Sequence, residues 1–215
     1  MIDIFKYTLG SLSTNAYLLC NKKKKQAIAI DAPEGMAKIV KNFLTDNHYK
    51  LVALFLTHGH WDHFFDAFMI QKMGIPVYAH KDDRIWIETV GLMEDYLPLN
   101  TNLKSCKIDY EYQYKKNLTF LDQSIEVIHS PGHSPGGVVL YFKKMGIAFV
   151  GDTIFAQSIG RTDLPGGDFQ KLKQSIQEKI YTLPKETRLY PGHGSLTTIY
   201  KEKVNNPFVR SLIKE

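Results

Sequence analysis

Short apolar runs of the kind found in β-strands open the chain and return in its second half, separated by stretches with helical spacing. The predicted strands are residues 2–8, 15–20, 26–31, 51–56, 76–79, 124–129, 138–142, 147–150 and 188–190. The predicted helices are residues 36–43, 62–73, 82–97 and 169–181, followed by a short helical tail. This order predicts a mixed α/β fold, with two sheets packed face to face and helices outside them.

The length of 215 residues favours one domain over residues 1–215, because domains commonly hold about 100–200 residues. Residues 98–116 are the least regular stretch, so an insertion or lid is expected there. The longest uninterrupted apolar run, residues 51–56, is far shorter than the roughly 18 residues that cross a bilayer. No membrane partner is therefore expected.

The charged residues and the cysteines give predictions about binding partners, redox state and location. The net charge of +5 is small and spread along the chain, which argues against a nucleic-acid partner. The densest basic run, residues 22–25, lies between two predicted strands and is expected to form a solvated hairpin turn. Cys20 and Cys106 are predicted to be reduced structural thiols. Residues 1–6 contain no basic leader or apolar segment, which predicts a cytoplasmic location.

The most informative segment is Thr57-His58-Gly59-His60-Trp61-Asp62-His63, directly after the predicted strand 51–56. It places four ligand-capable side chains within six residues, an arrangement that arises by chance in about one such chain per thousand or fewer. Structural zinc sites favour cysteine ligands, and neither cysteine is nearby in the sequence. The segment therefore indicates a catalytic metal site.

Three further polar residues stand beside glycine at the ends of apolar runs, namely His133, Asp152 and His193. Each alone would be an ordinary loop residue. Together with the first segment they give seven possible ligands, enough for two metal ions.

Other histidine, aspartate and aromatic residues are predicted to have supporting, packing or surface roles and not to be ligands. Asp31 is a candidate acceptor for a ligand imidazole, whose tautomer it would fix. His129 is predicted to be a packed or supporting imidazole, and His48 and His80 to lie on the surface. Trp61 is predicted to be a packing residue, with a substrate platform as the alternative.

The five segments resemble the metallo-β-lactamase superfamily, whose motifs run in the same order from H-x-H-x-D-H to separate His, Asp and His residues. The resemblance extends from residue 1 to about residue 200 and implies a four-layer αβ/βα sandwich. It also implies two divalent metal ions, with zinc expected and iron or manganese possible. By position, the first ion takes His58, His60 and His133, and the second takes Asp62, His63 and His193, with Asp152 bridging both.

Within the superfamily, Gly151-Asp152-Thr153-Ile154-Phe155 and Ser158-Ile159-Gly160-Arg161 resemble the glyoxalase II branch, and residues 160–168 resemble its short bacterial members. This implies hydrolysis of a small thioester such as S-D-lactoylglutathione, with Asp62 and Asp152 as catalytic residues and Arg161 binding an anionic substrate group. True β-lactamases are disfavoured, because they typically carry cysteine in place of Asp152 and are exported.

Two alternatives remain open. The Gly-Arg-Thr-Asp string at residues 160–163 also resembles the persulfide dioxygenases, which use one iron ion, and related folds include RNA-processing nucleases. Two departures from glyoxalase II predict looser selection for glutathione: Asp163 stands in place of a tyrosine, and the chain ends soon after residues 206–208. Aromatic residues between 82 and 116 could compensate, namely Trp86, Tyr96, Tyr110 or Tyr112. The oligomeric state is not predicted.

Overall fold

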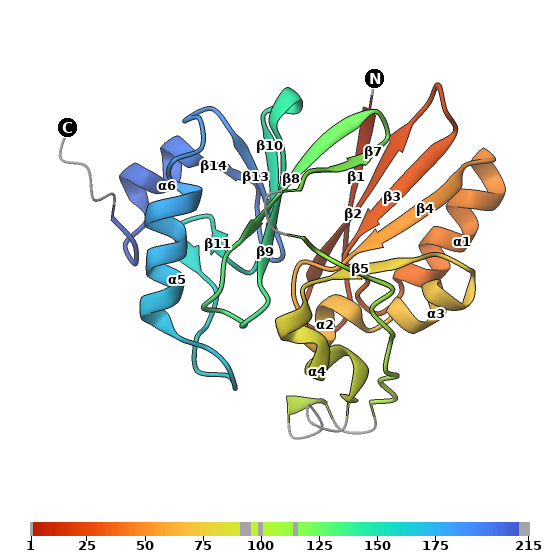
Figure 1. Cartoon of the computed structure of the whole chain (residues 1–215), viewed down its shortest axis with the longest axis horizontal. Coiled ribbons are helices and arrows are strands. Elements are labelled where there is room, and N and C mark those ends of the chain that lie inside the picture. The colour runs from red at the N-terminus through yellow and green to blue at the C-terminus, as the bar shows by residue number, and fades with distance from the viewer. Residues whose placement is uncertain (1, 91–95, 99–100, 114–115, 211–215) are drawn as a thin grey trace. The chain divides into compact units, whose positions relative to one another are not determined.

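The computed structural model describes residues 2–90, 96–98, 101–113 and 116–210. The chain divides into two compact units, Met1–Tyr112 and Gln113–Glu215, and each contains one six-stranded sheet (Figure 1). The prediction of a single domain over residues 1–215 is not tested by this division and stays a prediction.

The sheet of the first unit has the strand order β1-β2-β3-β4-β5-β6. Its strands are β1 (Ile2–Leu9), β2 (Thr14–Asn21), β3 (Gln26–Ile30), β4 (Lys50–Phe55), β5 (Val77–Ala79) and β6 (Tyr110–Glu111). The pairs β1–β2 and β2–β3 are antiparallel, whereas β3 to β6 run parallel. The carboxyl ends of β3, β4 and β5 therefore meet at one edge. Residues 22–25 form the exposed turn between β2 and β3, as predicted.

The helices of the first unit are α1 (Met36–Asn47), α2 (Trp61–Phe64), α3 (Ala67–Lys72), the 3₁₀ turn η1 (Lys81–Asp83) and α4 (Arg84–Glu88). Figure 1 shows α1 and α3 along one face of the sheet. Their buried side chains, such as Val40 and Ile70, join strand residues such as Ala27 in one hydrophobic core. The small strand side chains allow the helices to approach closely.

Two predicted helices are shorter than expected. The helix predicted over 62–73 is divided because Asp66, between α2 and α3, is held by the start of α1. Its carboxylate accepts the N–H groups of Gly35 and Ala37 at 2.9 and 2.8 Å, which otherwise lack partners at a helix N-terminus. The helix predicted over 82–97 ends at Glu88; residues 91–95 lie outside the described residues.

The sheet of the second unit has the order β14-β13-β10-β9-β8-β7. Its strands are β7 (Leu118–Phe120), β8 (Gln123–His129), β9 (Val138–Phe142), β10 (Ile147–Gly151), β13 (Arg188–Pro191) and β14 (Thr197–Thr198). Only β10 and β13 run parallel, and the other pairs are antiparallel. The four longer predicted strands of this unit are confirmed.

Helices cover the second sheet as well (Figure 1). They are α5 (Phe169–Ser175), which continues into the π-helical turn η4 (Ile176–Ile180), and α6 (Ile199–Asn205), with a 3₁₀ turn η3 (Lys143–Met145) between β9 and β10. Leu172, Ile176 and Ile199 pack with strand residues in the core of this unit. A short hairpin of β11 (Ile154–Phe155) and β12 (Ser158–Ile159) follows β10.

Cys20 and Cys106 are both buried and form no disulfide. Burial raises the pKa of each thiol to about 12, so both stay protonated at neutral pH. The prediction of reduced structural thiols is confirmed. Among the described residues, no helix has the length and apolar character needed to cross a bilayer.

Candidate functional site

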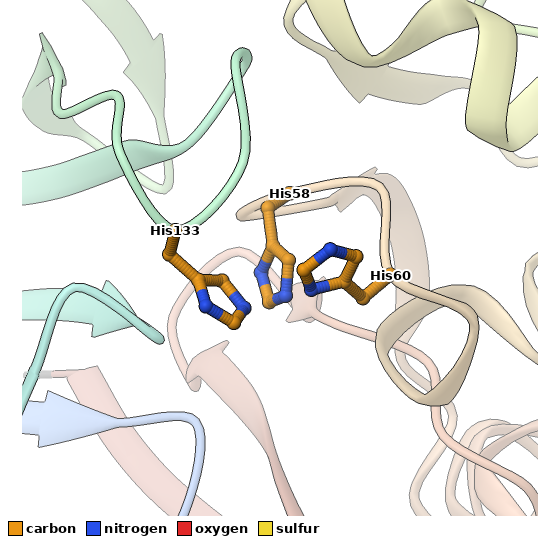
Figure 2. A group of neighbouring side chains, drawn as sticks. All are labelled: His58, His60 and His133. Carbon is orange, nitrogen blue, oxygen red and sulfur yellow. The ribbon is translucent and has the colours of Figure 1, made fainter. Parts of the chain in front are cut away.

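The histidine-rich segment of the first unit lies where β4 ends. Residues 57–60 form a loop, and α2 begins at Trp61. Figure 2 shows His58 and His60 on this loop, and their rings meet edge to face with centroids 4.9 Å apart. The four candidate ligands in this segment are all buried, and His63 has no exposed surface. Buried ionisable groups require polar partners, so their contacts reveal their roles.

Asp31 organises the buried end of this cluster. It follows β3, and its carboxylate accepts the N–H and the hydroxyl of Thr57, each at 2.8 Å. Its Oδ2 also lies 2.8 Å from Nδ1 of His63. Because a carboxylate can only accept hydrogen bonds, Nδ1 of His63 carries the hydrogen and Nε2 is the acceptor nitrogen. The prediction that Asp31 fixes the tautomer of a candidate ligand is supported by these contacts.

His58 is oriented by the same aspartate through Thr57. The Thr57 hydroxyl has one hydrogen, which it donates to Asp31. It must therefore accept a hydrogen from Nδ1 of His58, 3.0 Å away. Nε2 of His58 is then its acceptor nitrogen, as in His63.

Asp62 brings a carboxylate close to these imidazoles. Its Oδ2 accepts the hydroxyl of Thr14 at 2.7 Å and lies 3.4 Å from Nε2 of His63. Two acceptor atoms at that distance repel each other unless a cation is shared between them. The donor set of the first unit thus fits a bound divalent metal ion.

Gly59, between the two histidines, is required by close packing. Its N–H donates to Oδ2 of Asp83 at 2.7 Å, and a Cβ at this position would lie only 2.9 Å from the Asp83 Cβ. The fully buried Asp83 therefore holds the His-Gly-His turn against the start of α4.

The second unit carries the other three candidate ligands on loops that follow strands. His133, also drawn in Figure 2, lies between β8 and β9. Its Nδ1 lies 2.7 Å from the main-chain oxygen of Arg161, which can only accept, so Nε2 is the acceptor nitrogen here too. Gly132 beside it has a φ of +133°, and a Cβ there would lie 2.1 Å from the Leu172 nitrogen.

Asp152 follows β10, and His193 follows the parallel strand β13. The N–H of Gly192 donates to the carbonyl of Gly151 at 2.8 Å, which holds the two strand ends together. Asp152 Oδ2 lies 3.4 Å from Nε2 of His133 and 3.4 Å from Nε2 of His193. A carboxylate oxygen placed between two imidazole nitrogens is suited to sharing a metal ion with each.

All seven predicted ligands are among the histidine and aspartate side chains that could hold a metal ion. The structure groups His58, His60, Asp62 and His63 in the first unit, and His133, Asp152 and His193 in the second. Their assignment to two particular ions stays a prediction.

The guanidinium of Arg161 is already paired with a carboxylate, that of Asp163. Its Nε and Nη2 donate to the two carboxylate oxygens of Asp163 at 2.8 and 2.7 Å, and both side chains are more than 60% exposed. This contact lowers the pKa of Asp163 to about 2. The predicted role of Arg161 in anion binding stays a prediction, and it requires a substrate to compete with Asp163.

Several secondary predictions have clear outcomes. His129 packs with Nε2 2.8 Å from the Pro135 carbonyl oxygen, Trp61 is buried as a packing residue, and His48 is exposed. The surface assignment of His80 is wrong: its side chain is buried, and Nδ1 accepts the N–H of Asp82 at the start of η1. Tyr112 is also buried and donates to the Leu56 carbonyl, so it supports β4 from within the core.

Sequence reasoning missed three supporting groups. Thr57 adjoins the first histidine, so a hydroxyl next to a ligand was a usable signal. Thr14 is 48 positions from Asp62, and no pattern in the sequence connects them. The Arg161 group that holds His133 is a backbone carbonyl, which every residue has, so residue identity gives no signal.

The family model described as "Metallo-beta-lactamase superfamily" matches residues 10–193. The chain belongs to this superfamily. It has the α/β metallo-β-lactamase fold, with two mixed sheets flanked by helices, and it is a metal-dependent hydrolase of this superfamily.

Among related proteins, the hydroxyacylglutathione hydrolase GloC of Haemophilus influenzae is 34% identical over 213 residues, covering 98% of each chain. Other relatives of similar identity have names no more specific than "probable metallo-hydrolase" or "uncharacterized protein". The names of these relatives therefore support metal-dependent hydrolysis as the chemistry, but they do not agree on a substrate.

Two solved structures resemble nearly the whole chain. The BLEG-1 B3 metallo-beta-lactamase is 39% identical with a TM-score of 0.88, covering 96% of this chain and 99% of that one. TTHA1623 in a di-iron-bound form is 33% identical with a TM-score of 0.81, covering 95% and 100%. The first of these proteins is described as a β-lactamase, and the second has been solved with two bound iron ions. The expectation that β-lactamase activity is disfavoured for this chain stays a prediction.

Proposed function

We propose that this protein hydrolyses a thioester, with S-D-lactoylglutathione as the representative substrate, using two divalent metal ions. The proposed ligands of the first ion are His58, His60 and His133, and those of the second are Asp62, His63 and His193, with Asp152 shared. This assignment follows the order of the family's motifs and the similarity to GloC.

The observation that carries the proposal is the orientation of the imidazoles within each unit. His58, His63 and His133 each have Nδ1 held by an acceptor, directly or through Thr57. Nε2 is thereby the nitrogen with a lone pair, as a metal ligand requires. Imidazoles that served only to pack a core would not need to share one tautomer, whereas these three do, two in the first unit and one in the second.

When bound, the two ions would lower the pKa of a shared water to near neutrality and polarise the substrate carbonyl. The chain's own residues prepare for this. Thr14 fixes one oxygen of Asp62, Asp31 keeps His63 and His58 in the ligand tautomer, and Asp152 is placed between two imidazoles. A thiol leaving group has a pKa of about 8.5 and departs readily as thiolate, so no side chain has to act as general acid.

Arg161 is the proposed anchor for an anionic group on the thiol part of the substrate. Its guanidinium can form a bidentate contact with a carboxylate, as it does with Asp163. Because both side chains are exposed and screened by water, the net strength of this pair is small, and an incoming carboxylate can replace Asp163.

The test combines metal analysis with a thioester assay on the purified protein. The expected result is two metal ions per chain and turnover of S-D-lactoylglutathione, both removed by chelation and restored by adding the metal. Protein with two ions that hydrolyses other substrates but no thioester would overturn the proposed substrate class. Protein that binds no divalent ion would overturn the proposed mechanism as well.

Hydrolysis of a β-lactam amide is the second candidate, favoured by the 39% identity with a B3 metallo-beta-lactamase. The same pair of ions could serve it, but an amide nitrogen is a poorer leaving group than a thiolate and needs a proton. Parallel assays with a chromogenic cephalosporin distinguish the two. We expect kcat/KM for the thioester to be the larger.

Zinc is the proposed metal, with iron as the alternative suggested by the di-iron form of TTHA1623. Imidazole and carboxylate ligands accept either ion. Elemental analysis of protein purified without added metal distinguishes them. One iron ion per chain with oxygen consumption on glutathione persulfide would instead support the dioxygenase alternative.

A further inference from the structure

Glu202 is a buried acid far along the chain from the predicted ligands. It lies on α6 in the second unit (Figure 1), and only 1% of its surface is exposed. Glutamate is almost never buried this fully unless its oxygens are paired. Its hydrogen-bond partners therefore show what it holds in place.

The two oxygens of Glu202 have different partners. Oε1 accepts the hydroxyl of Thr197 in β14, a contact local to the end of the sheet. Oε2 accepts the backbone N–H of Gln157 at 2.8 Å and the side-chain amide of Asn206 at 3.0 Å. The second oxygen thus reaches a segment 45 residues earlier in the chain.

That segment is the turn of the β11–β12 hairpin. Gln157 has a φ of +60°, a left-handed conformation that is uncommon outside glycine and needs support from its surroundings. Asn206 adds a second contact to the same turn, since its amide donates to the Ser158 carbonyl at 3.0 Å. Glu202 and Asn206 therefore clamp the turn from α6.

The other end of this hairpin lies against two predicted ligands. β12 leads into Gly160, where a Cβ would lie 1.9 Å from the Asp152 carbonyl oxygen and 2.9 Å from Nδ1 of His133. The next residue, Arg161, supplies the carbonyl oxygen that accepts the hydrogen bond from Nδ1 of His133, with 2.7 Å between the two atoms. Only two residues separate Ser158, and three separate Gln157, from Arg161, whose carbonyl fixes the imidazole.

We infer that Glu202, with Asn206, is a positioning pair that sets the β11–β12 hairpin so that the Arg161 carbonyl holds His133 in its Nδ1–H tautomer. Neither residue is a catalytic residue or a ligand. Supporting partners of ligand imidazoles commonly change metal affinity by 10–100-fold when removed, and here the effect is transmitted through the hairpin.

Glu202→Met tests this with a side chain of similar length, because it has no oxygen to accept the hydrogens that Oε2 receives from Gln157 and Asn206. Thr197→Val is the matched control. It removes the contact of Oε1 with the same carboxylate but leaves the hairpin contacts in place. A role in overall stability alone would make the two variants similar.

The first readout is the ring-nitrogen NMR spectrum of His133 in metal-free protein, assigned by comparison with His133→Gln. We expect one Nδ1–H tautomer in the parent protein and in Thr197→Val, and a mixture of tautomers in Glu202→Met. An unchanged His133 signal in Glu202→Met, or an equal change in Thr197→Val, would overturn the inference.

The second readout is zinc affinity measured by chelator competition, and it rests on the proposed function. Glu202→Met is expected to bind zinc at least about tenfold more weakly, with Thr197→Val close to the parent. If the parent protein binds no zinc, the proposed function fails while the NMR comparison still decides the role of Glu202.

If Glu202→Met does not fold, Asn206→Ala takes its place. This variant removes the contact to the Ser158 carbonyl and keeps the Glu202 contact to Gln157. We expect the same change in the His133 signal at smaller amplitude. A folded Asn206→Ala protein with the parent spectrum would overturn the inference.

Discussion

The two units carry predicted ligands that are held in different ways. In the first unit, four ligands lie within six residues, and a side-chain carboxylate, Asp31, orients His63 directly and His58 through Thr57. In the second unit, three ligands follow three separate strands, and a main-chain carbonyl orients His133. The first arrangement depends on residue identity and the second on the path of the backbone.

This difference determines which substitutions should matter in each unit. A side-chain acceptor can be removed by one mutation, so we expect the first unit to be sensitive to substitution of Asp31. A carbonyl cannot be removed by mutating its own side chain, so the second unit is sensitive where the backbone is packed, at Gly160 and in the β11–β12 hairpin.

The largest effect is expected for Asp152→Ala, because Asp152 Oδ2 lies beside two imidazoles and is the proposed shared ligand. Metal content and thioester turnover should both fall, with turnover reduced by orders of magnitude. His129→Ala is the matched control, since that ring contacts the Pro135 carbonyl oxygen and should leave metal content near normal. Full turnover by Asp152→Ala with two bound ions would refute the assignment.

Gly160→Ala should be nearly as severe. The added methyl group would lie 1.9 Å from the Asp152 carbonyl oxygen, so the backbone must move away from both Asp152 and His133. We expect weaker metal binding together with a lower melting temperature.

Gly146→Ala is the control for this prediction. Gly146 has a φ of +61° and no atom within 4 Å of an added Cβ, so it carries only conformational strain of about 1–2 kcal/mol. It should lower the melting temperature but retain metal affinity. Equal metal affinities for the two variants would show that packing at Gly160 does not position the second unit's ligands.

Asp31→Asn tests the first unit. The amide keeps the size of the side chain but can accept through only one atom, so it cannot serve all three donors. Metal affinity is expected to fall about 10–100-fold. Asp66→Asn is the control, because Asp66 accepts two N–H groups at the start of α1 and should affect stability alone. An Asp31→Asn protein that binds metal as tightly as Asp66→Asn would contradict the proposed role.

The contrast between the units also explains what the sequence could reveal. The H-x-H-x-D-H segment is local, so its ligands and their position after a strand could be predicted from spacing alone. Asp31 could be proposed from its position at the end of a predicted strand, whereas the parallel pairing of β3 with β4, which brings it to the motif, is seen only in the structure. His133, Asp152 and His193 needed the additional clue of glycine at a strand end.

Long-range contacts account for most of the errors in the fold. The helix predicted over 62–73 is broken because Asp66 is held by residues 31 and 29 positions away. His80 has no motif around it, so its burial at the start of η1 could not be deduced from neighbouring residues. The short strands β6, β11, β12 and β14 have two residues each, too few for a periodic pattern to be visible.

The smallest effect on activity is expected from substitutions in the exposed Arg161–Asp163 pair. These substitutions separate the role of the Arg161 side chain from that of its main-chain carbonyl. Arg161→Ala keeps the carbonyl that holds His133, so metal affinity should not change, whereas KM for an anionic thioester should rise by up to about tenfold with kcat nearly constant. Asp163→Asn should lower KM, because the guanidinium no longer has a competing carboxylate. The pKa of Asp163 is depressed to about 2, so this carboxylate stays charged and the pair persists until the pH falls toward that value. The difference in KM between Asp163→Asn and the parent should therefore be constant from about pH 5 to 8. A loss of kcat in Arg161→Ala would instead show that its side chain helps to hold the loop, and with it the carbonyl, in place.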